Sequence, residues 1–145
     1  MDEMIKQKIL ALLDENRIMT IATLRPDGWP QATTVGYVNK GLTLYFLCGL
    51  DSQKAANLAR DNRVSLTIDH DADQIMEITG LSMAAHAHAV VDRAEAERIL
   101  QMIPLKYPKQ VSMPGPMPKP EDVRILWNFG TVEFPFPELP AADGR

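Results

Sequence analysis

The stretch from Ile18 to Cys48, IMTIATLRPDGWPQATTVGYVNKGLTLYFLC, carries the clearest strand pattern of the chain. Apolar, β-branched and aromatic residues alternate along it in three runs, which predict strands over Ile18–Leu24, Gln31–Val38 and Leu42–Cys48. The connections, Arg25-Pro26-Asp27-Gly28 and Asn39-Lys40-Gly41, have the composition of tight turns. Parallel strands would need long crossovers, so we expect the three strands to form an antiparallel meander.

Helices and further strands are predicted on both sides of the meander. Apolar residues at helical spacing predict helices over Met4–Asn16, Ser52–Arg60 and Ala94–Ile103, the last with Asp92 as its N-cap. Alternation predicts three more strands, over Val64–Ile68, Ile75–Val91 and Val123–Phe136. Six strands, short helices and hairpin connections indicate a mainly β, α+β fold, a small antiparallel barrel with helices at its ends.

The C-terminal third is rich in proline. Six of the 11 prolines fall between Pro104 and Pro120. Proline interrupts helices and central strands, so this segment is predicted to be an irregular strap or a lid. Residues 138–145 are predicted to form a flexible tail, which leaves residues 1–137 as one domain.

Composition and charge exclude several classes of protein. The 145 residues carry 15 basic and 19 acidic side chains, a net charge of −4, which argues against a general nucleic-acid or anionic-membrane binder. No apolar run approaches the ~20 residues of a membrane helix, and the acidic start Met1-Asp2-Glu3-Met4 is unlike a signal peptide. A single cysteine, Cys48, fits a reducing compartment. We therefore expect a cytoplasmic protein that binds any anion through local contacts.

A candidate anion site lies in Gly49-Leu50-Asp51-Ser52-Gln53-Lys54-Ala55, where a strand turns into a helix. Lys54 falls in the first helical turn, where a cation opposes the helix dipole by roughly 0.3–1 kcal/mol. A bound phosphate would reverse that sign, with backbone N–H groups, the Ser52 hydroxyl and Lys54 around it. The alternative is a solvated lysine behind an ordinary N-cap.

Two more features near this turn have a functional and a structural interpretation. Thr33 and Thr34 place hydroxyls on opposite faces of a strand, and Gly36 indicates close approach of a ligand or of another backbone. Strand propensity and a bulge explain the same residues without a ligand. Cys48 could be a nucleophile, but it completes an apolar stripe, which favours a structural thiol.

Metal-like patterns are present but incomplete. His86 and His88 share one strand face and could bind zinc with a third ligand, although two imidazoles on a solvent or interface face explain them better. The run Asp69–Asp73 resembles the start of a calcium loop, but Gln74 and Gly80 stand where such a loop needs Gly and Glu. We predict no metal site.

The run from Tyr45 to Leu58, followed by Asn62-Arg63-Val64-Ser65-Leu66, resembles the pyridoxamine 5′-phosphate oxidase-like FMN-binding split-barrel family. Its Ser-x-Lys turn, Asn-Leu helix and Asn-x-Arg-Val strand entry match the family's pattern, and the element order agrees over Met4–Phe136. The resemblance implies a six-stranded antiparallel split β-barrel with short flanking helices. It also implies a homodimer with FMN at the subunit interface.

The resemblance assigns site residues by position. The flavin phosphate would be held by Thr33, Ser52, Gln53 and Lys54, and the ring would lie against Thr34, Val35, Gly36, Leu47 and Cys48. Thr33, Val38 and Gln53 stand where the true oxidase has arginine, lysine and arginine, and its arginine-rich C-terminal motif is absent. Oxidation of pyridoxamine phosphate itself is therefore not expected.

We expect an FMN-dependent oxidoreductase whose small-molecule substrate, electron donor and catalytic residues the sequence does not reveal. One alternative is a deazaflavin (F420)-dependent reductase on the same fold. The longer anionic tail of F420 favours several cations, and only Lys54 is evident, so FMN fits better. The other alternative is a flavin-binding or electron-transfer module without catalysis of its own.

Overall fold

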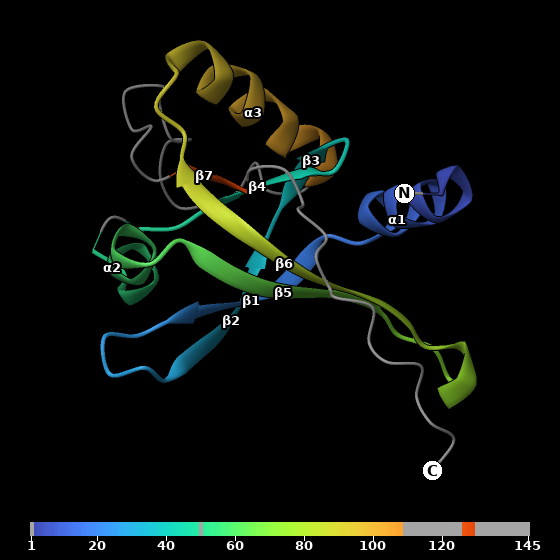
Figure 1. Cartoon of the computed structure of the whole chain (residues 1–145). Coiled ribbons are helices and arrows are strands. Elements are labelled where there is room, and N and C mark those ends of the chain that lie inside the picture. Colours follow the sequence, from blue (N-terminus) through green and yellow to red (C-terminus); the bar gives the residue numbers. More distant parts are fainter. Residues whose placement is uncertain (1, 50, 109–125, 130–145) are drawn as a thin grey trace.

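The computed structural model describes residues 2–49, 51–108 and 126–129 (Figure 1). In chain order the elements are α1 (Glu3–Glu15), β1 (Ile18–Leu24), β2 (Pro30–Gly36), β3 (Val38–Lys40), β4 (Thr43–Leu47), α2 (Gln53–Arg60), β5 (Arg63–His70), the 3₁₀ helix η1 (Ile75–Glu77), β6 (Thr79–Ala89), α3 (Arg93–Lys106) and β7 (Leu126–Phe129). The three predicted helices are confirmed.

The strands form one antiparallel sheet in the order β2-β1-β5-β6-β7-β4-β3. The 11-residue strand β6 is shared, because Thr79–His86 pairs with β5 and Ala87–Ala89 pairs with β7. Two half-sheets, β2-β1-β5-β6 and β6-β7-β4-β3, therefore meet along β6, with the helices at the margins (Figure 1). This arrangement confirms the split β-barrel with short flanking helices.

The predicted meander is only partly correct. The hairpins β1–β2 and β3–β4 are both present, but the predicted strand Gln31–Val38 is divided at Tyr37 into β2 and β3. As a result β2 and β3 lie at opposite ends of the strand order, and the described residues form a sheet of seven strands rather than six. The Tyr37 N–H donates to the carbonyl oxygen of Arg17 (3.4 Å) and to Tyr107 Oη (2.9 Å). This N–H therefore needs no acceptor on a neighbouring strand.

The core follows from strand alternation. Inward-pointing side chains of β1, β5 and β6 pack against Ile9 and Leu13 of α1. From the strands they are Met19, Ile21, Val64, Leu66, Ile68, Met83 and Ala85. A second cluster lies beneath α3 and contains Val38, Tyr45, Val90, Ala96 and Ile99. Burial of these faces fixes the register of each strand, since a slip of one residue would expose every inward side chain.

The proline-rich segment begins later than predicted. Helix α3 runs to Lys106 with Pro104 inside its last turn, so the expectation that Pro104 opens an irregular segment is wrong. Proline near the end of a helix removes one hydrogen bond, and the helix still closes through the N–H of Tyr107, which donates to Ile103 (2.9 Å). Asp92 caps the start as predicted, accepting from the Ala94 N–H (3.1 Å).

Several other predictions concern residues outside the described ranges. These are most of the lid or strap up to Pro120, most of the strand Val123–Phe136, and the tail 138–145. The predicted strand Ile75–Val91 begins only at Thr79, because residues 75–77 form η1. Among the described helices none is long and apolar enough to cross a membrane.

Candidate functional site

A fully buried asparagine attaches α2 to the barrel. Asn57 has 0% exposure, and its Nδ2 donates to Thr23 Oγ1 of β1 (3.0 Å) and to Gln31 Oε1 of β2 (3.1 Å). Its Oδ1 accepts from Gln53 Nε2, one turn earlier in the helix (2.9 Å). Both amide donors and the carbonyl oxygen therefore have partners, as a buried amide requires. These bonds hold α2 against β1 and β2.

Ser52 is the N-cap of α2. Its Oγ accepts from the Ala55 N–H (3.1 Å) and donates to the carbonyl oxygen of Gly49 (2.7 Å). The hydroxyl is therefore already used in the cap. The backbone N–H groups of Gln53 and Lys54 precede that of Ala55 and have no acceptor within the helix. They are the groups of this turn that an anion can bind.

Lys54 is half-buried in the first turn of α2, a turn that contains no acidic residue. Within the described part of the chain, no carboxylate pairs with its ammonium group. A cation at this end adds to the positive potential of the helix dipole. An anion bound here would be stabilised by both, as the sequence predicts for a phosphate.

Thr33 supplies an orphaned polar atom on the neighbouring strand. Thr33 pairs with Ile21 on β1 and follows Gln31 by two positions on the same inward face of β2. Thr33 Oγ1 is buried and has no hydrogen-bond partner in the described structure. An unsatisfied buried hydroxyl costs about 1–3 kcal/mol, so a ligand that reaches it would be stabilised. We call Thr23, Gln31, Thr33 and residues 52–57 the α2 corner.

The residues expected at the flavin ring fall on two strands. Thr34 and Gly36 are exposed on the outer face of β2, whereas Val35 is half-buried on the inner face. Leu47 and Cys48 are half-buried where β4 ends and the chain turns toward α2. Cys48 also packs against the main core. The two threonine hydroxyls thus point to opposite faces, as predicted, and only that of Thr33 belongs to the α2 corner.

The close approach predicted at Gly36 is made by a side chain of α3's C-cap residue. A Cβ at Gly36 would lie 3.0 Å from Tyr107 Oη. The same hydroxyl accepts from the N–H of Tyr37 (2.9 Å), lies 2.8 Å from the carbonyl oxygen of Tyr37, and bonds to the carbonyl oxygen of Arg17. Glycine at position 36 therefore makes room for Tyr107 at the bend between β2 and β3.

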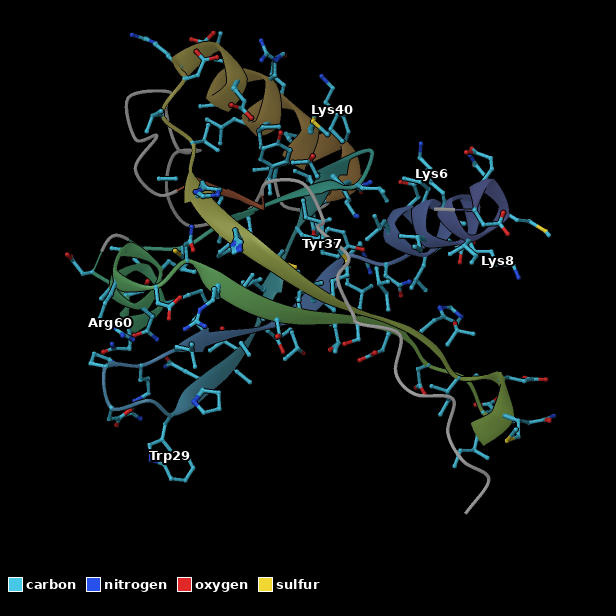
Figure 2. The ribbon with its side chains drawn as sticks, viewed as in Figure 1. Lys6, Lys8, Trp29, Tyr37, Lys40 and Arg60 are labelled. Carbon is cyan, nitrogen blue, oxygen red and sulfur yellow. The ribbon has the colours of Figure 1, made fainter. Side chains whose placement is uncertain are left out.

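Tyr37 and Lys106 extend this contact to α1. Tyr37 Oη lies 2.8 Å from the carbonyl oxygen of Leu13 and 2.9 Å from that of Asn16. Lys106 Nζ donates to the Leu13 carbonyl (2.9 Å) and lies 3.9 Å from the centroid of the Tyr37 ring. Figure 2 shows Tyr37 between the barrel and α1. We call Tyr37, Lys106 and Tyr107 the tyrosine junction.

Burial changes the acid–base properties of this junction. It lowers the pKa of Lys106 from 10.5 to about 8, an effect that the nearby Asp14 carboxylate partly opposes. It also raises the pKa of both Tyr37 and Tyr107. Each hydroxyl is bonded to backbone groups, so the junction has a structural role and leaves no acid or base directed at the α2 corner.

The histidine pair lies on the outer face of β6. His86 is opposite Arg63 of β5, and His88 is opposite Asn128 of β7. Arg63 donates two side-chain hydrogen bonds to Asp61 (3.0 and 2.7 Å). These bonds from Arg63 lower the pKa of Asp61 to about 2. In the described ranges no three His, Cys, Asp or Glu side chains gather as metal ligands.

Sequence reasoning missed the bonds that build both clusters. The signal for Asn57 is its place inside a helix, because asparagine is a poor helix former that needs a local reason to be there. No comparable signal marks Tyr107, whose partner Tyr37 is 70 residues away. Local sequence carries no information about a contact at that separation.

Comparison with known proteins identifies the family. Residues 5–132 match the family model described as pyridoxamine 5′-phosphate oxidase. The chain belongs to this family. It is also similar to general stress protein 26 of Bacillus subtilis (strain 168), with 24% identity over 127 residues, 84% of this chain and 88% of that protein. The family predicted from the Ser52–Lys54 turn is thus confirmed.

Solved structures share the fold of this family member. HutZ, the heme storage protein from Vibrio cholerae, matches with a TM-score of 0.68 at 17% identity, over 88% of this chain and 89% of that one. An FAD-binding protein from Mesorhizobium loti matches with a TM-score of 0.67 at 15% identity, over 92% and 91%. At these identities the likeness shows the split-barrel fold alone.

Proposed function

We propose that the protein is an FMN-binding flavoprotein, an oxidoreductase of the pyridoxamine 5′-phosphate oxidase-like type with the flavin phosphate at the α2 corner. One observation carries the proposal: the ammonium group of Lys54 stands without a carboxylate partner among the described residues, beside two backbone N–H groups that have no acceptor in the helix. A dianionic phosphate would bind all three donors.

The orphaned hydroxyl of Thr33 supports the fit. It can donate to a phosphate oxygen from the strand that Gln31 and Asn57 hold against α2. The ring would then lie along Thr34–Gly36 and the end of β4 at Leu47 and Cys48. A bound flavin supplies hydride or electron transfer, and this chain's residues hold and orient it.

The outer face of β2-β1-β5-β6 supports a homodimer. Strand register places two rows of small side chains across all four strands, Ala32–Ala22–Ser65–Ala84 and Thr34–Thr20–Thr67–Ser82. Most of these residues are exposed, and no described helix covers them. Small side chains allow a second sheet to approach at the ~10 Å spacing of stacked sheets. A second copy on this face would complete a flavin site that begins at Thr34 on its edge.

FMN fits the corner better than F420 does. Lys54 is the one cation on the first turn of α2, and Gln53 directs its side chain to Asn57. The longer anionic tail of F420 would find no further cation on that turn. Recording the visible spectrum after reconstitution with FMN, F420, FAD and haem separately distinguishes these cofactors. Binding of F420 alone would replace the proposal by a deazaflavin reductase.

Replacing Lys54 tests the phosphate site. We expect Lys54→Ala to weaken FMN binding by about 1–3 kcal/mol, because a charge-assisted hydrogen bond is lost. Lys40→Ala is the matched control, since Lys40 is exposed on β3 and should leave the affinity unchanged. Flavin fluorescence quenching measures both. Equal FMN affinities for the wild type and Lys54→Ala would contradict the site.

Thr33→Val gives a second test with a different signature. Valine keeps the branched shape but removes the orphaned hydroxyl, so the ligand-free protein should gain stability while FMN affinity falls by about 1 kcal/mol. Thermal unfolding with and without FMN measures both effects. A loss of stability without the ligand would show that Thr33 Oγ1 has a partner of its own.

Oxidation of NADH and NADPH by the FMN-loaded protein separates an enzyme from a flavin-binding or electron-transfer module. Turnover that requires bound FMN supports the oxidoreductase. Tight FMN binding without turnover on any donor or acceptor tried would favour the non-catalytic module on the same site.

A further inference from the structure

An exposed apolar cluster marks the hairpin between β5 and β6. We call residues 71–78 the arm. It projects beyond the barrel where β5 ends at His70 and β6 begins at Thr79 (Figure 1). Ile75, Met76 and Ile78 on it are 80%, 91% and 50% exposed. Contiguous large apolar side chains on a projecting element indicate a surface that another molecule covers.

The arm is also strongly acidic. Asp71, Asp73 and Glu77 lie on it and Asp69 at its base, and none of these carboxylates forms an ion pair within the described residues. Four uncompensated negative charges around an apolar tip repel one another in the free protein. A partner that is both apolar and basic would relieve that repulsion.

The opposite end of the same sheet face offers such a surface. A cavity of about 350 Å³ lies there, with Leu24 and Pro30 on one side and Arg63 and His86 on the other. Its floor includes Ala22, Ser65 and Ala84, whose small side chains leave it open. Trp29, 71% exposed at the tip of the β1–β2 hairpin, adds apolar surface at this end (Figure 2).

The hydrogen-bond donors at the cavity complement the carboxylates of the arm. Arg63 and His86 are the only ionisable groups that line it, and Asp61 engages two of the three guanidinium nitrogens of Arg63. The third nitrogen has no acceptor among the described residues. The nearby Arg60 bonds to a backbone carbonyl, that of Leu24 (2.5 Å), rather than to a carboxylate. The cavity end therefore has donors available for an acidic segment.

We propose that the arm of one copy seats in this cavity on a second copy, so that Ile75 and Met76 lie against Leu24 and Pro30. The inference rests on the homodimer of the proposed function and names the contact that would hold it. Both features lie on the paired strands β5 and β6. The cavity is at the end where Arg63 pairs with His86, and the arm follows the end where His70 pairs with Thr79.

Strand geometry makes the contact reciprocal. β5 has eight residues, so its ends are about 23 Å apart at about 3.3 Å per residue. Consider a twofold axis that lies parallel to the sheet above Thr67 and at right angles to the strands. It places the arm of each copy over the cavity of the other. Two equal contacts then flank the row Thr34–Thr20–Thr67–Ser82, which stacks on its own copy at the centre.

Lysine substitution on the arm tests the contact against a matched control. Met76→Lys should raise the dimer dissociation constant at least tenfold in sedimentation velocity over a dilution series. Val91→Lys puts the same charge at an equally exposed apolar site, 87% exposed and away from the arm, and should leave the constant unchanged. Both residues are surface residues, so circular dichroism should show native spectra for both variants.

Cross-linking tests the partner surface. Met76→Cys protein mixed with Pro30→Cys protein should form a disulfide-linked heterodimer under mild oxidation, whereas Val91→Cys with Pro30→Cys should not. Each variant alone controls for the natural Cys48. Absence of the Met76–Pro30 cross-link, together with an unchanged dissociation constant for Met76→Lys, would overturn the arm contact.

The outcomes separate this inference from the proposed function. A dimer that survives Met76→Lys without cross-linking refutes the arm contact and leaves the dimer and the flavin site standing. A wild-type protein that is monomeric at every concentration refutes both the dimer and the arm contact. FMN titration of the same sample then decides the flavin site separately.

Discussion

The α2 corner and the tyrosine junction each attach a helix to the barrel through buried polar groups, but they differ in what they leave unsatisfied. In the tyrosine junction the Tyr37 and Tyr107 hydroxyls and the Lys106 ammonium bond to backbone groups. In the α2 corner Asn57 is satisfied by other side chains, while Lys54 and the hydroxyl of Thr33 have no partner among the described residues. A cluster that is complete stabilises the fold, and one that is incomplete is suited to bind a ligand.

The largest expected effect is at Asn57. Asn57→Ala should lower the free energy of unfolding by about 2–3 kcal/mol, because it leaves a cavity and removes the partners of Thr23 and Gln53. Asn39→Ala is the control, since the Asn39 side chain bonds only to an exposed turn carbonyl (3.0 Å) and should cost about 0.5 kcal/mol or less. Urea denaturation measures both. Equal costs would mean that the buried network does not hold α2.

Tyr107→Phe should have the next largest effect. It keeps the ring but removes the hydroxyl that satisfies the N–H of Tyr37, with an expected loss of about 1–2 kcal/mol. FMN affinity should change much less than in Lys54→Ala, because the junction contributes no group to the phosphate site. If Tyr107→Phe instead abolished FMN binding while the protein stayed folded, the distinction between the two clusters would be lost.

A pH dependence distinguishes the junction further. The pKa of Lys106 falls from 10.5 to about 8 on folding, so the folded protein binds fewer protons than the unfolded chain between these values. The free energy of unfolding therefore rises with pH in that window, relative to Lys106→Met. After allowance for solvent screening the relative gain is about 1 kcal/mol. Thermal unfolding at pH 7.5 and pH 9.5 measures it.

Comparing the wild type with Lys106→Met cancels the contributions of other titrating groups. Tyr37 and Tyr107 begin to ionise in the unfolded chain near pH 10, which lowers the free energy of unfolding and opposes the effect of Lys106, but both proteins contain these tyrosines. If the stability difference between the wild type and Lys106→Met is the same at pH 7.5 and pH 9.5, burial does not lower the pKa of Lys106.

The smallest effect is on the ligand-free stability of Lys54→Ala. Removing a cation from the first turn of α2 should raise the free energy of unfolding by about 0.3–1 kcal/mol. With saturating FMN the sign should reverse, because the wild type gains more from the bound phosphate. Differential scanning calorimetry with and without FMN gives both values, and a loss of stability in both states would indicate a structural lysine.

The two clusters also differ in how far sequence reasoning reached them. The Ser52–Lys54 turn can be identified from the sequence because the cation and the start of the helix lie within three residues, where local rules apply. Asn57 belonged to the same motif, but its partners Thr23 and Gln31 are 34 and 26 residues away. Local rules do not predict the tyrosine junction. For Gly36 they offer a ligand, another backbone or a bulge, whereas the neighbour in the structure is the side chain of Tyr107.

The sequence alone predicts the local structure, namely the alternating strands, the turns and the N-cap at Asp92, and it predicts the family. These depend on residues within a few positions of one another. Closure of the whole barrel makes the chain bend at Tyr37 and divides one predicted strand between two half-sheets. It also decided which polar groups are satisfied and which remain available. That outcome depends on contacts such as the one between Tyr37 and Tyr107, 70 residues apart, which form only when the whole barrel closes.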